Sequence, residues 1–218
     1  GDMAFVRNCV AVEAALARAQ GRLGIIPQEA AAAISAAADA ILAGREALDL
    51  ARLKRETETV GFPILPLVRQ LAAQAGEAGR YLHWGATTQD IIDSAVVLQI
   101  RDGLALIERD LDTLRGHLAA LAKTHRDTPM PGRTFFQQAL PITFGYKAAV
   151  WLSSFDRHAE RLAELKPRVL VAEFGGAVGT LASLGSGAEA LRTVGELARE
   201  LGLGEPAITW HVARDTIV

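Results

Sequence analysis

The sequence has little cysteine, few aromatic residues and no long uninterrupted apolar run. One of its 218 residues is cysteine, and 6% are aromatic. A single cysteine cannot form an internal disulfide, so we expect a reducing, cytoplasmic location. Cys9 lies on an apolar helical face and is expected to be a small buried hydrophobe. No apolar run approaches the ~18 residues that cross a bilayer, so no membrane association is expected.

The charge pattern is also weak. The formal net charge is −2, and no basic stripe is present, so nucleic acid is not an expected partner. Half of the residues are hydrophobic, which is enough for a sizeable core. The length allows one large domain or two small ones.

Helical periodicity dominates the chain. Helices are expected over about 3–20, 27–42, 46–55, 63–74, 88–125, 141–167 and 188–201. Residues 76–85 and 126–140 are expected to be loops, because glycine and proline interrupt the pattern there. No alternation of strands and helices is present. The sequence therefore predicts an all-α fold, with a smaller N-terminal helical domain (1–86) followed by the first part of a long-helix bundle (87–218).

The longest predicted helix carries a heptad stripe. Its apolar members alternate spacings of three and four: Val97, Ile100, Leu104, Ile107, Leu111, Leu114, Leu118 and Leu121. This spacing is typical of a long helix in a bundle. Extended backwards, the stripe reaches Asp93 and Asp90. The inward face thus becomes acidic where the helix begins, which a purely structural core does not require.

The segment that opens this helix is polar. It brings His83, Thr87, Thr88, Asp90 and Asp93 to a helix start, where unpaired backbone N–H groups and the helix dipole favour anions. Capping explains a threonine and an acidic residue in the first turn. It does not explain the histidine and two inward carboxylates, so a helix cap and a binding site both remain open.

Two further segments have polar or glycine-rich character. Arg133, Thr134 and Gln137 crowd a predicted loop, where an arginine fork with hydroxyl and amide groups suits a carboxylate ligand. An ordinary polar loop between helices is the alternative. The glycine-rich run 175–187, which includes Gly179 and Thr180, allows either close helix packing or a turn around a ligand. No metal-ligand spacing is evident, so no metal is expected.

Together these segments carry a family resemblance. His-Trp-Gly-Ala-Thr-Thr-Gln-Asp (83–90), Gly-Arg-Thr-Phe-Phe-Gln (132–137), Gly-Ala-Val-Gly-Thr (176–180) and Arg-Asp (214–215) follow one another in the order found in the fumarase/aspartase superfamily. The chain resembles this superfamily over nearly its whole length. The resemblance implies an all-helical homotetramer in which each active site is built from segments of three subunits.

Two departures from the family pattern indicate which branch of the superfamily this chain resembles most. The lyases of the family, such as adenylosuccinate lyase, carry a histidine where this chain has Phe135. They also carry a Thr-Arg-His-Asp segment near 57–60, which here reads Thr-Glu-Thr-Val. The 3-carboxy-cis,cis-muconate cycloisomerase branch characteristically lacks both histidines, and this sequence looks most like that branch.

The resemblance implies intramolecular addition of a carboxylate to a double bond of a muconate tricarboxylate, giving a lactone in the β-ketoadipate pathway. It implies Arg133 as a carboxylate clamp, with donors from Thr87, Thr88, Thr134 and Gln137. His83 becomes the candidate catalytic group, as a substrate binder or a proton relay, while Gly179 and Thr180 are further substrate-binding candidates. No cofactor is implied.

The family's mobile serine loop is absent from these residues. We therefore expect the chain to be the N-terminal part of a longer enzyme and to be inactive alone. An adenylosuccinate lyase-like enzyme that releases fumarate and a non-catalytic helical assembly module are the alternatives.

Overall fold

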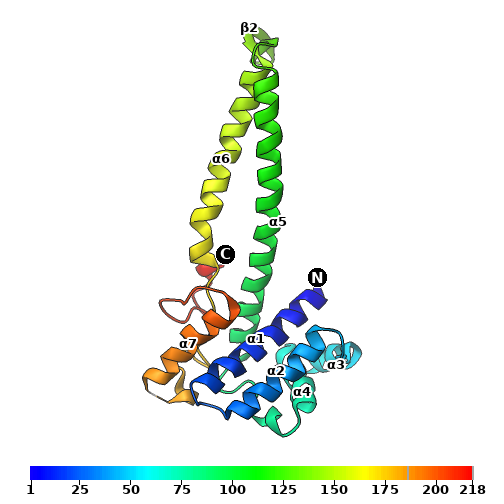
Figure 1. Ribbon diagram of the computed structural model, residues 1–218, viewed down its shortest axis with the longest axis vertical. Helices are drawn as coiled ribbons and strands as arrows, with labels where there is room; N and C mark the ends of the chain where they lie inside the picture. The colour runs from blue at the N-terminus through cyan, green and yellow to red at the C-terminus, as the bar shows by residue number, and fades with distance from the viewer. Residues whose placement is uncertain (186, 218) are drawn as a thin grey trace. The chain divides into compact units, whose positions relative to one another are not determined.

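The computed structural model describes residues 1–185 and 187–217. In that part of the chain the fold is all-α, as predicted, with a single two-stranded sheet (Figure 1). The α-helices are α1 (Asp2–Arg22), α2 (Gln28–Leu42), α3 (Leu50–Val60), α4 (Ile64–Ala75), α5 (Thr88–Thr124), α6 (Phe144–Val169) and α7 (Ala188–Leu201). The strands are β1 (Pro129–Thr134) and β2 (Gln137–Thr143), and the 3-10 helices are η1 (Gly76–Tyr81), η2 (Ala182–Leu184) and η3 (Arg214–Thr216).

These elements form two compact units. The first unit comprises residues 1–101 and 168–218, and the second comprises 102–167. The sequence predicted a domain boundary between residues 86 and 87. The two compact units are defined by contacts and do not test that boundary, so it stays a prediction. None of the helices in the described residues combines the length and the apolarity needed to cross a membrane.

The core of the first unit is organised around α1. This helix packs against α2, α4 and α7 (Figure 1). Leu16, Ile34, Leu71 and Leu197 bring one fully buried side chain from each of these four helices. Cys9 is buried as predicted, and burial followed by the nearby Glu13 charge raises the pKa of its thiol to about 12. Cys9 therefore stays a neutral thiol at physiological pH.

The third helix begins later than the sequence pattern indicates. A helix over 46–55 is wrong at both ends, because α3 runs from Leu50 to Val60. The Asp49 side chain caps it, accepting a hydrogen bond of 2.8 Å from the backbone N–H of Arg52. Gly61, with φ of 94°, ends it in the left-handed conformation that glycine tolerates best.

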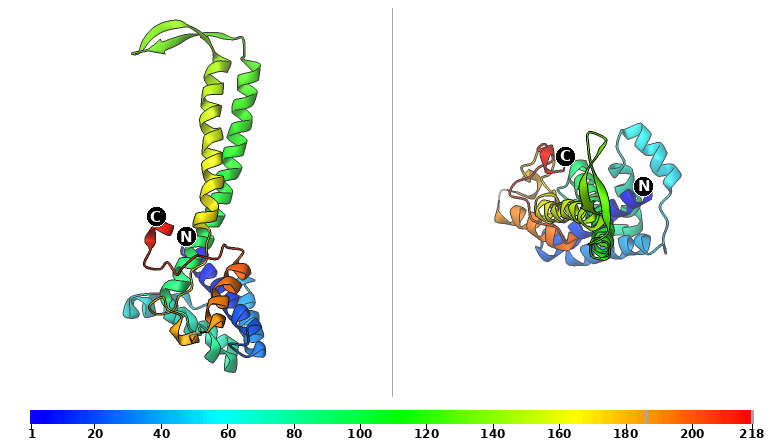
Figure 2. Two further views of the ribbon diagram at one scale, coloured as in Figure 1. Left: turned by 90° about the vertical axis from the view of Figure 1, so that its left-hand side faces the viewer. Right: turned by 90° about the horizontal axis from the view of Figure 1, so that it is seen from above.

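The second unit contains the antiparallel pair formed by most of α5 and α6, which lie side by side in both views (Figure 2). Ion pairs join them, among them Arg115 with Asp156 at 2.7 Å and Lys166 with Glu108 at 2.6 Å. Gly145 permits the close approach of the helix ends, since a Cβ there would lie 2.6 Å from the carbonyl oxygen of Ala122.

A β-hairpin joins these helices where a loop and an early helix start were predicted. β1 and β2 pair antiparallel, with Pro131 opposite Pro141 and a bulge between Pro131 and Arg133. Pro141 therefore lies in a strand, and α6 begins at Phe144. Proline lacks the N–H that a ladder needs, and the bulge accommodates this locally. Single-sequence periodicity missed the strands because they are short and rich in proline.

Candidate functional site

Asp90 connects the start of α5 to the glycine-rich segment. One of its carboxylate oxygens accepts hydrogen bonds from the backbone N–H groups of Thr87 and Gly176, both at 2.9 Å. The other oxygen accepts from the N–H of Gly175 at 3.0 Å. Burial raises the pKa of Asp90 despite these three donors. The side chain thus fixes two distant backbone segments, and all of this lies in the first unit.

Asp93 has an equally buried carboxylate with a different pair of partners. Gln89 donates to one oxygen at 2.8 Å, and Arg214 donates to the other at 2.5 Å. The bond to Asp93 raises the pKa of the Arg214 guanidinium. Asp90 and Asp93 are both fully buried, so the acidic continuation of the heptad stripe is inward as predicted. Its role in the structure is to join α5 to later parts of the chain.

His83 lies just before α5 and is paired with a residue of α1. Its Nδ1 is 2.6 Å from Oε1 of Glu13. Burial acts to lower the pKa of His83, but the hydrogen bond and charge of Glu13, with a contribution from Asp90, raise it overall. His83 also has a φ of 60°, which is uncommon for a residue other than glycine. Its protonated form is therefore favoured by its surroundings.

Thr87 and Thr88 lie at the mouth of α5, both half-buried. The backbone N–H of Thr87 is already bonded to Asp90. Among the described residues, neither threonine hydroxyl makes a hydrogen bond within the chain. These two hydroxyls, unlike the N–H, remain available to a ligand.

Gly179 is required for packing. Its φ is +80°, and a Cβ on it would lie 3.1 Å from Oγ1 of Thr209 and 3.3 Å from Cε1 of His211. The Thr209 hydroxyl donates to the Gly179 carbonyl at 3.2 Å. Thr180, which follows, is exposed. The glycine-rich run thus permits close packing at Gly179 and presents Thr180 to solvent.

A second histidine–carboxylate pair supports this loop. Oε1 of Glu173 lies 3.3 Å from Nδ1 of His211, and Oε2 accepts the backbone N–H of Trp210 at 2.6 Å. Burial raises the pKa of Glu173, although these bonds act in the opposite direction. The side chains of Asp90, Glu173 and His211 bring ligand atoms within 4.8 Å of one another. Three of the four carboxylate oxygens already accept backbone N–H groups, so the cluster is arranged for amide donors more than for a cation.

Arg133, Thr134 and Gln137 lie in the second unit, on the hairpin, and are exposed. Within the described residues the Arg133 guanidinium makes no hydrogen bond or ion pair. Phe135 and Phe136 form the two-residue turn between the strands, with φ of 45° and 61°. Their side chains are 92% and 104% exposed, which leaves two large aromatic groups at the tip without intrachain packing.

The structure therefore brings His83, Thr87, Thr88 and Gly179 into one unit around buried carboxylates. Sequence reasoning missed Glu13, Glu173 and their pairing with the two histidines. A signal for Glu13 was present, because Cys9, Glu13, Leu16 and Gln20 share one face of α1 at helical spacing. Two polar residues on such a face indicate buried partners elsewhere in the chain, and both residues are buried.

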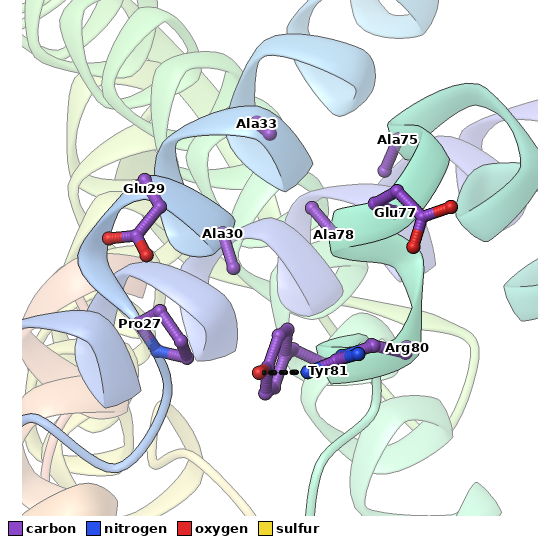
Figure 3. A pocket seen from close by; sticks show the side chains of 9 residues that line it. All are labelled: Pro27, Glu29, Ala30, Ala33, Ala75, Glu77, Ala78, Arg80 and Tyr81. Atoms are coloured by element: carbon purple, nitrogen blue, oxygen red, sulfur yellow. Dashed lines mark hydrogen bonds between the residues drawn. The ribbon is translucent and has the colours of Figure 1, made fainter.

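A separate pocket of about 470 Å³ lies between α2 and η1 (Figure 3). Four alanines form much of its lining: Ala30, Ala33, Ala75 and Ala78. Arg80 donates a hydrogen bond of 2.8 Å to the Tyr81 hydroxyl at its edge. None of the predicted site residues lines this pocket, and its one arginine is already engaged.

The fold and the site define a predominantly helical protein in which buried carboxylates fix polar segments around the start of a long helix. The chain belongs to the Lyase family of the fumarase/aspartase superfamily, whose profile matches residues 3–218.

Individual relatives agree with this membership. The chain is 47% identical to 3-carboxy-cis,cis-muconate cycloisomerase of Pseudomonas aeruginosa, with 100% of the chain and 47% of that protein aligned. It is 45% identical to adenylosuccinate lyase of Pyrococcus abyssi, over 91% of the chain and 42% of that protein. The crystal structure of a fumarate lyase from Mesorhizobium sp. BNC1 is 66% identical with a TM-score of 0.92, covering 97% of this chain and 48% of that one. The chain thus spans about half the length of the relatives it matches.

Proposed function

We propose that this chain is part of a cycloisomerase that converts 3-carboxy-cis,cis-muconate into a carboxymuconolactone. The identity of residue 135 carries the proposal. The family resemblance implies a histidine at this place in the lyases, whereas this chain has a phenylalanine at the exposed tip of the hairpin. A cyclisation within one substrate has no separate leaving group to protonate, so it does not need that imidazole.

The reaction forms a C–O bond between a substrate carboxylate oxygen and one carbon of a double bond. The electron pair of the double bond moves to the neighbouring carbon, which takes up a proton. Negative charge develops next to a second carboxylate during this step, so fixed donors around that carboxylate stabilise the transition state. Catalysis therefore needs an anion clamp, hydrogen-bond donors and a group that holds a proton.

Each of these needs has a candidate in the chain. Arg133 is free of intrachain ion pairs in the described residues and can bind a carboxylate with two parallel hydrogen bonds. The unbonded hydroxyls of Thr87 and Thr88 lie at a helix N-terminus, where an anion is favoured. His83 has a pKa raised by Glu13 and can hold the proton.

Thr134 and Gln137 flank the tip of the hairpin and would orient a second carboxylate, with Thr180 as a further donor. We propose that these segments meet in a homotetramer, where different subunits contribute to one site. No cofactor is assigned a role in this reaction.

The complete product of the gene that encodes this chain should consume 3-carboxymuconate, which is followed by the loss of diene absorbance. Adenylosuccinate is the matched rival substrate, because a relative 45% identical to this chain is an adenylosuccinate lyase. Cleavage of adenylosuccinate without turnover of 3-carboxymuconate would overturn the proposal in favour of the lyase. Turnover of neither would favour the helical assembly module.

A further inference from the structure

Glu13 is an unusual side chain for the centre of a helical core. Its carboxylate is fully buried on α1, and Oε2 has no hydrogen-bond partner in the described part of the chain. Oε1 contacts one group there, Nδ1 of His83, at 2.6 Å. Burying a carboxylate with a single partner is costly, since the uncompensated lone pairs lose their hydration. A structural carboxylate such as Asp90 is instead surrounded by backbone donors.

The histidine that Glu13 contacts is itself held in a costly backbone conformation. A φ of 60° is strained for a residue other than glycine, and at His83 it persists only where the surroundings enforce it. Helix α1 enforces it with two side chains two turns apart. Glu13 binds the imidazole, and Gln20 donates to the carbonyl of the next residue, Trp84, at 2.7 Å. The strained backbone of His83 and the buried charge of Glu13 thus both act to hold the His83 imidazole in one position.

The geometry also fixes which nitrogen is available. A carboxylate at Nδ1 requires the N–H on that nitrogen, so the remaining functional nitrogen is Nε2. The His83 side chain is 22% exposed, whereas that of Glu13 is 0% exposed. Only the imidazole can therefore be reached from outside the core.

We propose that Glu13 is the positioning residue for His83: it selects the Nδ1–H tautomer, holds the ring by its inner edge and presents Nε2 to the substrate. This inference rests on the proposed function, in which His83 handles the proton. It deepens that function by naming Glu13 as the carboxylate that controls the protonation of His83.

The charged surroundings of His83 are consistent with this assignment. Glu13 faces it from α1 and Asp90 acts on it from α5, and both are acidic. Cys9, one turn from Glu13 on α1, is a neutral thiol with a pKa of about 12. Beyond Asp90 lie His211 and Glu173 of the C-terminal part of the unit. The carboxylates around the imidazole favour its cationic form, and Glu13 is the one in contact.

The test is a titration of the His83 imidazole by NMR in the 218-residue chain, in wild type and in Glu13→Gln. The amide can still accept a hydrogen bond from Nδ1 but carries no charge. The His83 midpoint should therefore fall by about one to two pH units, as expected for loss of an adjacent opposite charge. Glu29→Gln, an exposed charge change on α2, is the matched control and should leave the midpoint in place. An unchanged midpoint in Glu13→Gln would overturn the proposal.

Should Glu13→Gln fail to fold, Glu13→Asp keeps the charge but withdraws it from Nδ1 by one methylene. Its midpoint should lie below that of wild type, and an identical midpoint would again contradict the pairing. In the complete gene product, the limb of the kcat/KM profile assigned to His83 should move with the NMR midpoint. The titration needs no substrate, so a failed cycloisomerase assay would refute the proposed function without affecting this result.

Discussion

Asp90 and Gly176 are 86 residues apart in the chain, yet a carboxylate oxygen of Asp90 accepts the backbone N–H of Gly176 at 2.9 Å. The same oxygen accepts the N–H of Thr87. One side chain therefore ties the threonine-bearing start of α5 to the glycine-rich segment. This contact explains why the heptad stripe becomes acidic without assigning Asp90 to the substrate.

Replacing Asp90 with asparagine should destabilise the protein strongly. The amide NH2 cannot accept hydrogen bonds, so at least one buried N–H among those of Thr87, Gly175 and Gly176 loses its partner. We expect a loss of about 2–4 kcal/mol in the free energy of unfolding. Urea denaturation measures it. Asp110→Asn, at an exposed position of α5, should change stability by less than about 0.5 kcal/mol. Equal effects of the two changes would contradict this role.

Replacing Arg133 with alanine should reduce kcat/KM of the complete gene product for its tricarboxylate substrate. Loss of a bidentate clamp is expected to cost about 2–3 kcal/mol of transition-state binding, or roughly 30–150-fold. Stability should stay unchanged, because Arg133 is exposed on the hairpin. Arg109→Ala removes another exposed arginine of the same unit and serves as the control. Near wild-type kinetics for Arg133→Ala would remove this residue from the site.

The buried pair of Glu13 and His83 should make stability depend on pH. A histidine whose folded pKa is raised contributes its full stabilisation below its unfolded pKa of about 6.5. It loses that contribution as pH rises through the higher folded pKa. The free energy of unfolding should therefore fall across this range in wild type.

The matched variant for this effect is Glu13→Gln/His83→Gln, which removes both charges together and leaves no unpaired carboxylate. Urea midpoints between pH 6 and 9 should fall less steeply in this variant than in wild type. His117→Gln changes an exposed histidine of α5 and should retain the wild-type slope. If the urea midpoint depends on pH equally in wild type and in the double variant, the Glu13–His83 pair is not the cause of the pH dependence.

The turn of the hairpin should be easy to stabilise at the expense of function. Phe135 and Phe136 both have positive φ, which asparagine and glycine adopt with less strain in a two-residue turn. The variant Phe135→Asn/Phe136→Gly should therefore raise the stability of the second unit by about 1–2 kcal/mol. Thermal unfolding measures this gain. If the aromatic tip serves the active site, kcat/KM should fall in the same variant; unchanged kinetics would assign the tip no role.

Much of the fold could be predicted from periodicity. The span of α5 agrees with prediction to about one residue, because heptad spacing over so long a stretch suits only a helix. The helices α1, α2, α4 and α7 also lie close to their predicted ranges. The hairpin was missed, since strands of six and seven residues with three prolines carry no clear alternation. α3 was misplaced because its start depends on the Asp49 cap.

The candidate site, like the fold, could be predicted from the sequence only in part. The sequence by itself determined the polar segments, the helical class and the inward direction of Asp90 and Asp93, because these follow from local spacing. Only the tertiary structure decided what those carboxylates bind and that Glu13 lies against His83, 70 residues away. Periodicity shows which residues share one face of a helix. The partner of a buried charge depends on which other segment packs there, and the spacing within one helix does not contain that information.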